Sequence, residues 1–350
     1  LDRVPPHAAV STSVEMIKRR CGRGASGLIN AILRRVLREG ERALPDATDD
    51  PVAHLAIRFS HPEWIVRRWC EELGTEATRG LLAANQEAAP TTLRICGDAP
   101  RETVLAQLES EGIHARAGRF APRAVVLDSP LANLKGRANS LALVAQSEAS
   151  QLVAALVGAQ PGERIADLCA APGGKTLVLA EALGESGLIF ASDIVRGGIR
   201  RVATRGMRCV ARADAARPPL RDADFDAVLV DAPCSGLGTL RGHPEIRWRR
   251  TPEDVTALAA TQARILHGAA ALVKPGGRLV YATCTLLAEE NEAVVRAFRD
   301  RHREFTPLDA AKLLPQPATE LADDQGCLRT SPGRDALDGF FATTLTRRQS

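Results

Sequence analysis

Two cysteines lie in short motifs that could carry nucleophilic chemistry, DAPCSG (231–236) and YATCT (281–285). A thiolate is a strong nucleophile and forms covalent intermediates with its substrates. A cytosine ring is one substrate that needs this, because C5 is too electron-poor to take a methyl group until a thiolate has added to C6. A second thiol can then help to release the product. The alternative is that Cys234 and Cys284 are small buried hydrophobes, the usual state of a free cysteine.

A strand, a glycine-rich turn and the start of a helix are predicted around DLCAAPGGKT (167–176). An apolar run ends in Asp167, two glycines follow, and a helical pattern continues over 176–183. Glycines let the backbone approach a ligand, and the free N–H groups at a helix start favour an anionic group. A nucleotide-triphosphate loop is excluded because its first glycine would have to stand at position 169, which is Cys169.

Acidic residues end four successive predicted strands. In open α/β sheets, an acid at the carboxyl end of a strand commonly holds a ribose hydroxyl. Each acid alone could be a helix cap or a loop residue. Four of them at one edge of a sheet predict a rim that binds a cofactor. The apolar runs 164–167, 187–193, 207–214 and 225–231 end in Asp167, Asp193, Asp214 and Asp231.

In combination, these motifs resemble those of the bacterial 16S rRNA cytosine-5 methyltransferases of the RsmB (Sun, Fmu) type. Residues 7–35 resemble the end of that family's NusB-like helical domain, and SHPEW (60–64) resembles the segment that follows it. The chain begins at Leu1, so we expect the first part of the NusB-like unit to be absent. The motifs that carry the resemblance are DLCAAPGGKT (167–176), DAPCSGLG (231–238), RGHPEIRW (241–248), YATCTLLAEEN (281–291) and DGFF (338–341).

The resemblance implies an RNA (cytosine-5-)-methyltransferase that uses S-adenosylmethionine and methylates a cytidine of 16S rRNA through a cysteine–C6 adduct. We expect the turn to hold the methionine end and ribose, Asp193 the ribose hydroxyls and Asp214 the adenine. Asp231, where cofactor and base meet, is implied to orient the target cytosine. The full set of expected cofactor-binding residues is Cys169, Ala170, Ala171, Pro172, Gly173, Gly174, Lys175, Asp193, Asp214 and Asp231.

The choice of nucleophile depends on which enzymes the motifs resemble. DNA cytosine-5 methyltransferases use the Pro-Cys pair, which would nominate Cys234, whereas the RNA enzymes use the Thr-Cys pair and leave the first cysteine to assist release. Because the surrounding motifs are of the RNA type, we expect Cys284 to attack, with Cys234 and Asp231 as its catalytic partners. Thr285 stands where the family usually has serine, a change that keeps the hydroxyl.

Arginines are clustered although the net charge is only +4. Those around Trp248, which are Arg241, Arg247, Arg249 and Arg250, are predicted to contact RNA phosphates. So are the basic residues of the amino-terminal helices, Lys18, Arg19, Arg20, Arg23, Arg34, Arg35 and Arg38. For Arg200, Arg201 and Arg205 we favour a solvated helical face. With one Tyr and three Trp, a base-stacking platform is not indicated, so recognition should depend on backbone charge and RNA shape.

Composition favours a cytoplasmic protein. No apolar run approaches the roughly 20 residues of a membrane span, and no secretory signal opens the chain. The eight cysteines include no CxxC pair and no zinc spacing, which fits unpaired thiols in a reducing compartment. We therefore expect a monomer without metal or membrane contact, whose partner is 16S rRNA or a small-subunit precursor.

Strands that alternate with helices predict an α/β protein with a parallel-rich, doubly wound, Rossmann-like methyltransferase domain. We expect a NusB-like helical RNA-binding segment over 1–50, a helical plus small α/β linking domain over 51–140, and the methyltransferase domain over 141–350. A prolyl linker is predicted at 45–51. Ser60 is expected to cap a helix that buries Trp64, Ile65, Val66, Trp69 and Leu73. The small unit is predicted to contain a strand at 92–95, a helix at 101–111 and a strand at 124–127. A late strand of the main sheet is predicted at 277–283.

Two other functions remain open at this point. One is C5 methylation of DNA or tRNA. The other is a non-enzymatic RNA-binding or antitermination factor, which only the NusB-like start suggests and against which the acids and both cysteines speak.

Overall fold

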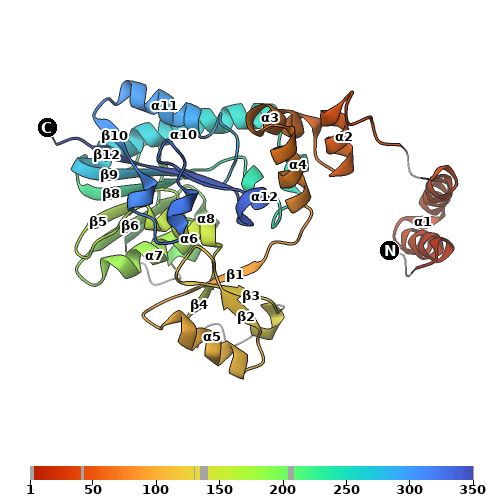
Figure 1. The fold of residues 1–350 in the computed structure, drawn as a ribbon, viewed down its shortest axis with the longest axis horizontal. Helices are drawn as coiled ribbons and strands as arrows, with labels where there is room; N and C mark the ends of the chain where they lie inside the picture. Colours follow the sequence, from red (N-terminus) through yellow and green to blue (C-terminus); the bar gives the residue numbers. More distant parts are fainter. Residues whose placement is uncertain (1–3, 41–42, 130, 135–140, 204–208, 350) are drawn as a thin grey trace. The chain divides into compact units, whose positions relative to one another are not determined.

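The computed structural model describes residues 4–40, 43–129, 131–134, 141–203 and 209–349 (Figure 1). The chain divides into two compact units, Leu1–Arg58 and Phe59–Ser350. Among the described helices, none combines the length and the apolar character that crossing a membrane requires.

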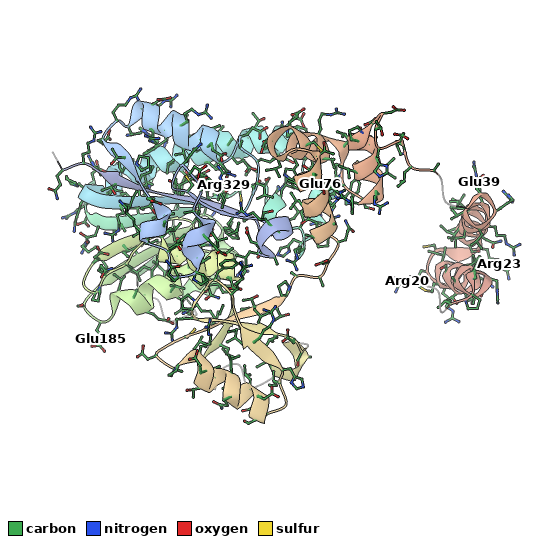
Figure 2. All side chains as sticks on the ribbon, viewed as in Figure 1. Arg20, Arg23, Glu39, Glu76, Glu185 and Arg329 are labelled. Carbon is green, nitrogen blue, oxygen red and sulfur yellow. The ribbon has the colours of Figure 1, made fainter. Side chains whose placement is uncertain are left out.

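The first unit is helical, as the sequence predicts for its amino-terminal part. It contains α1 (Pro6–Glu39) and α2 (Pro51–Arg58). The helix α1 is kinked at Gly22, whose φ of 83° lies in the left-handed region that favours glycine. The basic side chains predicted to contact phosphates are exposed along α1, and Figure 2 shows Arg20 and Arg23 on its surface.

The second unit opens with α3 (Glu63–Leu73) and α4 (Thr75–Ala84). The predicted cap at Ser60 is wrong: Ser60 lies in a turn with φ 50°, and Pro62 occupies the N-cap position, so the hydroxyl is too far from the first helical amides. Ile65, Val66 and Trp69 are buried as predicted and Trp64 is half-buried, but Leu73 is 43% exposed because Gly74 ends the helix directly after it.

A small α/β unit follows, with an antiparallel sheet in the order β2-β3-β1-β4. The predicted strands and helix of this unit are confirmed. Apolar side chains of the sheet and of α5, such as Ile95 and Leu108, form its core. The elements are β1 (Thr91–Ile95), α5 (Arg101–Ser110), β2 (Ala115–Ala117), β3 (Ala124–Leu127), a 3-10 turn (Leu131–Leu134) and β4 (Leu143–Ala145).

The main sheet has the order β10-β12-β9-β8-β5-β6-β7, with β11 beside β12. The run from β7 to β9 is parallel, and β12 joins it antiparallel. Its strands are β5 (Arg164–Asp167), β6 (Leu188–Asp193), β7 (Cys209–Arg212), β8 (Phe225–Asp231), β9 (Val273–Thr283), β10 (Phe305–Leu308), β11 (Leu328–Thr330) and β12 (Phe340–Arg347). Residues 207 and 208 of the predicted third strand lie outside the described residues.

Helices cover both faces of this sheet, which confirms the doubly wound fold (Figure 1). Successive residues of β8 face opposite sides of the sheet. Leu229 packs with α6 and α7, whereas Val228 packs with α10 and α11. The helices are α6 (Glu148–Ala155), α7 (Gly174–Leu183), α8 (Arg196–Ala203), α9 (Ile246–Arg249), α10 (Pro252–Leu272), α11 (Glu292–Arg301) and α12 (Pro332–Asp335). On α8, Arg200 and Arg201 are exposed as predicted, while Arg205 lies outside the described residues.

The strand order reverses at β5, because β6 and β7 lie on one side of it and β8 and β9 on the other. In open α/β sheets, ligands bind in the crevice outside the carboxyl ends of the strands at such a point. The fold therefore brings the ends of β5, β8 and β9, which are remote in sequence, to one edge of the sheet.

Candidate active site

A cavity of about 480 Å³ lies at this edge. Of the residues expected to bind a cofactor, the cavity is lined by Cys169, Ala170, Ala171, Pro172, Gly174, Lys175 and Asp231. Gly173 forms the N-cap of α7 with φ 97°, a left-handed conformation that orients the helix start toward the turn. Gly174 and Lys175, the first two residues of α7, line the cavity.

Asp167 closes the inner end of the cavity and is only 1% exposed. Burial raises the pKa of this carboxyl to about 7, although the Thr176 hydroxyl, which donates to Oδ2 at 2.7 Å, opposes the shift. Oδ1 has no hydrogen-bond partner among the described residues, and neither does Oε1 of Gln146, which lines the same cavity. These two buried acceptor oxygens therefore lack a hydrogen-bond donor, and a cationic group of a ligand could donate to them.

Asp193 and Asp214 lie beside the cavity rather than in its lining. Asp193 Oδ2 accepts the Ala171 N–H at 3.1 Å and Oδ1 accepts the Val195 N–H at 2.8 Å, so this carboxylate joins the two turns that follow β5 and β6. Asp214 Oδ1 accepts the Ala216 N–H at 2.9 Å. Asp193 ends β6 and Asp214 follows β7, and each carboxylate holds the local backbone.

The two motif cysteines meet, with Sγ of Cys234 and Sγ of Cys284 3.3 Å apart. They converge because β8 and β9 are parallel neighbours, with Asp231 paired to Ala282 at their carboxyl ends. The Cys284 backbone N–H also donates to Cys234 Sγ at 3.2 Å. The neighbouring Cys284 thiol, followed by burial, raises the pKa of Cys234 well above its ordinary value, so Cys234 is a thiol at neutral pH.

Cys169 lines the cavity and shares the raised pKa of Cys234. Burial, and then the charges of the surrounding aspartates, raise its pKa well above the ordinary value. A thiol that resists ionisation is a poor nucleophile. Cys169 therefore belongs to the wall of the cavity, and the two thiols that approach each other are Cys234 and Cys284.

Lys175 and Asp231, both half-buried, form an ion pair in the wall of the cavity. Lys175 Nζ donates to Asp231 Oδ2 at 2.6 Å. Burial alone would lower the pKa of Lys175, but the Asp231 carboxylate and the nearby Cys284 sulfur outweigh it and raise that pKa. Lys175 is therefore a fixed positive charge beside the Asp231 carboxylate.

A buried polar network holds both cysteine loops. Glu290 Oε1 accepts the Ser235 N–H at 2.8 Å and the Gln262 amide at 2.9 Å. Gln262 also donates to the Pro233 carbonyl at 3.0 Å. The sequence analysis assigned no role to Glu290 or Gln262. Glu290 belongs to the motif LLAEEN after Cys284, which could have indicated its importance. Gln262 lies on a helix without any motif.

Two further contacts join the loops directly. The Ser235 hydroxyl donates to the Thr285 hydroxyl at 2.9 Å, so threonine at 285 keeps the hydroxyl in use, as expected. Gly238 donates its N–H to the Cys284 carbonyl at 2.9 Å, and a Cβ there would come within 2.0 Å of the Gly339 carbonyl oxygen. Only glycine fits this approach, which brings the DGFF tail against both loops.

The structure corrects the expected RNA contacts of the Trp248 region. Arg247 is 5% exposed, and its guanidinium donates to the carbonyls of Pro244, Ser60 and Asn85, so an internal contact replaces the predicted phosphate contact. Arg241 is also occupied, by the carbonyls of Ala336 and Ala88, and Arg250 by that of Ser235. Arg249 is exposed.

Several other residues in the cavity wall escaped sequence reasoning. Asp338 lines the cavity, and burial raises its pKa, opposed by the Ser147 hydroxyl. No local pattern marks these positions, apart from the DGFF motif, because they come from segments far apart in the chain. The wall also contains Gln146, Ser147, Ser150 and His243. Within the described residues, no group of metal-ligating side chains is found.

Residues 154–346 match the family described as 16S rRNA methyltransferase RsmB/F. Residues 61–133 match the ferredoxin-like domain of RsmF/B-like methyltransferases, and residues 1–38 match the NusB family. Over 99% of its length the chain is 34% identical to the probable ribosomal RNA small subunit methyltransferase B of Bacillus subtilis (strain 168), of which it covers 80%. It is 38% identical, again over 99% of its length, to ribosomal RNA small subunit methyltransferase B of Salmonella arizonae, of which it covers 79%. The crystal structure of PH0851 superposes with a TM-score of 0.83 at 28% identity, covering 97% of this chain and 77% of that one.

Proposed function

Because the chain belongs to the 16S rRNA methyltransferase RsmB/F family, we propose that it methylates C5 of a cytidine in 16S rRNA through a covalent bond between Cys284 and C6. The observation that carries this proposal is the 3.3 Å approach of the two motif thiols beside the Lys175–Asp231 pair. The relatives' names supply the substrate, which we take to be 16S rRNA or a small-subunit precursor.

Attack on the base requires a thiolate and a place for the charge that develops in the ring. The Cys284 thiol gives its proton to water, and the electron pair left on its sulfur forms the bond to C6. The C5–C6 π electrons move toward C5 and into the ring. We assign Asp231 to accept a hydrogen bond from the N4 amino group and so to orient the base. The base must reach the cysteines out of a stack, so the RNA is single-stranded there or the base is flipped.

Release needs the sulfur to leave again. Once C5 carries the methyl group, its proton passes to water and the electron pair of that C–H bond forms the C5–C6 double bond again. The bond from Cys284 to C6 then breaks, and its electron pair leaves on the sulfur. The Cys234 thiol, 3.3 Å away, donates its proton to the departing sulfur. Its raised pKa suits this role, because it keeps the proton until a thiolate appears beside it.

S-adenosylmethionine fits the cavity at the end of β5 and, when bound, supplies an electrophilic methyl group. The unpartnered Asp167 Oδ1 and Gln146 Oε1 suit the ammonium of its methionine end. The first amides of α7 suit the carboxylate. Asp193 is the acid at the end of β6, where ribose hydroxyls are received in open α/β sheets. We assign Asp214 to the adenine side on the same grounds.

RNA binding is proposed for the exposed basic residues rather than for all the predicted ones. Arg249 is exposed and directly precedes Arg250, whose guanidinium donates to the carbonyl of Ser235. The exposed basic residues of α1 supply a second set of charges. Contacts of this kind position an RNA backbone without reading its sequence.

A methyl-transfer assay tests the proposal. Purified protein with labelled S-adenosylmethionine is given unmodified 16S rRNA, tRNA and duplex DNA side by side, and modified nucleosides are identified by mass spectrometry. We expect 5-methylcytidine in 16S rRNA alone. Label in tRNA or DNA but not in 16S rRNA would contradict the substrate, and methylation at another atom would contradict the chemistry. No cofactor binding by calorimetry would favour a non-enzymatic RNA-binding protein.

A further inference from the structure

A second cavity, of about 510 Å³, lies between the α4 end and the loop that precedes α9. Its wall includes Asn85, Glu87, Glu245 and Trp248. Trp248 is 64% exposed, whereas the fully buried Trp69 belongs to the core. An indole exposed to this extent beside a cavity provides a flat apolar face, and nucleobases stack on such faces.

The cations in the wall of this cavity are already engaged. The guanidinium of Arg247 donates to three backbone carbonyls, and that of Arg241 donates to two. The two arginines therefore fix the loop to α4 and to the residues near Asp338. They do not offer the fork of donors that a phosphate needs, so the cavity is not built for the RNA backbone.

The remaining polar residues of the wall are Ser60, Asn85, Gln86, Glu87 and Glu245, and three of them contribute acceptor oxygens that matter here. Asn85 is 4% exposed, and its Oδ1 has no hydrogen-bond partner among the described residues. Glu87 and Glu245 add two carboxylates to the same wall. Such a set repels a phosphate and suits a ligand that donates, as the exocyclic amino group of a base does to a carboxylate or an amide oxygen.

The cavity also lies next to the reaction site. His243 lines the cavity at the end of β5, and the following residues Pro244 and Glu245 line the second cavity, so one loop separates the two. Arg250, just after α9, donates to the carbonyl of Ser235, the residue that follows Cys234, at 2.9 Å. A nucleotide in the second cavity would therefore be a close neighbour of a base held at the cysteines.

We propose that this second cavity binds a base of the RNA flanking the target cytidine, stacked on Trp248, and that it selects a base with an exocyclic amino group. The inference rests on the proposed function and adds a specificity site to it. It makes recognition depend on a base as well as on backbone charge.

Binding of short single-stranded RNAs tests the stacking part. Each RNA carries one cytidine flanked by adenosines, and affinity is measured by fluorescence anisotropy of a terminal dye. Trp248→Ala should weaken binding by about 5- to 150-fold, the range for loss of one stacked base. Trp248→Phe should retain most of the affinity, because it keeps an aromatic face. Leu73→Ala, which removes an exposed apolar side chain outside the cavity, is the matched control and should bind as the wild type does.

The proposed selection for an exocyclic amino group is tested by removing that group from the flanking bases of the RNA. Replacing the flanking adenosines by purine riboside, or flanking guanosines by inosine, removes the amino group and keeps a bicyclic ring for stacking. We expect wild-type affinity to fall about tenfold with at least one flanking position, and Glu245→Gln to reduce this difference.

Intrinsic fluorescence gives a readout that does not depend on activity. RNA should quench the wild-type emission, and this change should disappear in Trp248→Phe. Equal RNA affinity in wild type and Trp248→Ala, with no quenching, would overturn the inference. If the wild type still methylates 16S rRNA in that case, the proposed function stands and only this site falls. A wild type that neither binds nor methylates 16S rRNA would remove both.

Discussion

Replacing Asp167 with Asn should change how the stability of the protein depends on pH. The carboxyl is 1% exposed, and burial raises its pKa from 3.8 to about 7. The folded state therefore binds this proton more tightly than the unfolded chain does. The stabilisation is fully present below pH 3.8 and is lost as the pH rises through about 7.

The size of the effect follows from the shift. A rise of roughly three pKa units at about 1.36 kcal/mol each gives a loss of about 4 kcal/mol across the whole window. About 3 kcal/mol of this falls between roughly pH 5 and 8, where unfolding can be measured. An asparagine of similar shape cannot ionise, so Asp167→Asn should lack this component. Relative to the wild type, the variant should gain stability as the pH rises.

Urea unfolding of both proteins without cofactor, at several pH values between 5 and 8, measures the difference. Subtracting the two free energies of unfolding at each pH removes the contribution of groups that both proteins share. Adding S-adenosylmethionine at pH 8 should stabilise the wild type more than the variant, because only the wild type offers a carboxylate to the ammonium. Parallel pH profiles for the two proteins would refute the reasoning about Asp167.

Other variants probe separate parts of the structure. Burial, aided by the charge of Arg247, lowers the pKa of His61 from 6.5 to about 4, so stability present above pH 6.5 is lost as the pH falls toward 4, by about 3 kcal/mol. In His61→Asn, urea unfolding should show this loss removed. Arg247→Ala should lower the free energy of unfolding by about 2–5 kcal/mol, measured by calorimetry, because it leaves buried carbonyls without a donor. Arg249→Ala should keep this stability and reduce the salt slope of RNA binding by about 0.7, measured by binding titrations at several salt concentrations. A loss of stability in Arg249→Ala with an unchanged salt slope would show that Arg249 is structural. Asp193→Ala should weaken S-adenosylmethionine binding by about 1–3 kcal/mol, and unchanged affinity in a folded variant would exclude Asp193 from the site.

The sequence predicted the main sheet well because its signal is local. Three of the predicted strands, β5, β6 and β8, end in the expected acids Asp167, Asp193 and Asp231. The third predicted strand is shorter than expected, because β7 ends at Arg212 and leaves Asp214 in the turn after it. Parallel neighbours bring their carboxyl ends together, so the meeting of Cys234 and Cys284 could be anticipated from strand order alone. The expected domain limits at residues 50 and 140 stay predictions, as do the roles of the individual site residues.

What the sequence could not supply depends on tertiary contacts. Arg247 lies among other arginines in the sequence, which is typical of an RNA contact. Only the structure shows that its guanidinium donates to the backbone carbonyls of Ser60 and Asn85. Gln146 and Asp338 reach the cavity from segments separated by almost two hundred residues. Leu73 fits the apolar spacing of α3, but the helix ends too soon to cover it.

A covalent complex with RNA is the most direct test of the proposed mechanism. Each variant is incubated with 16S rRNA and S-adenosylmethionine and run on a denaturing gel. Cys234→Ala should still attack and methylate but release slowly, and so accumulate as a slower-moving protein–RNA band that depends on the cofactor. Cys284→Ala should give no band and no methylation, and Cys21→Ala, which changes an exposed cysteine of α1, should behave as the wild type. A band in Cys284→Ala and none in Cys234→Ala would reverse the two roles, and methylation by Cys284→Ala without any band would contradict the covalent mechanism.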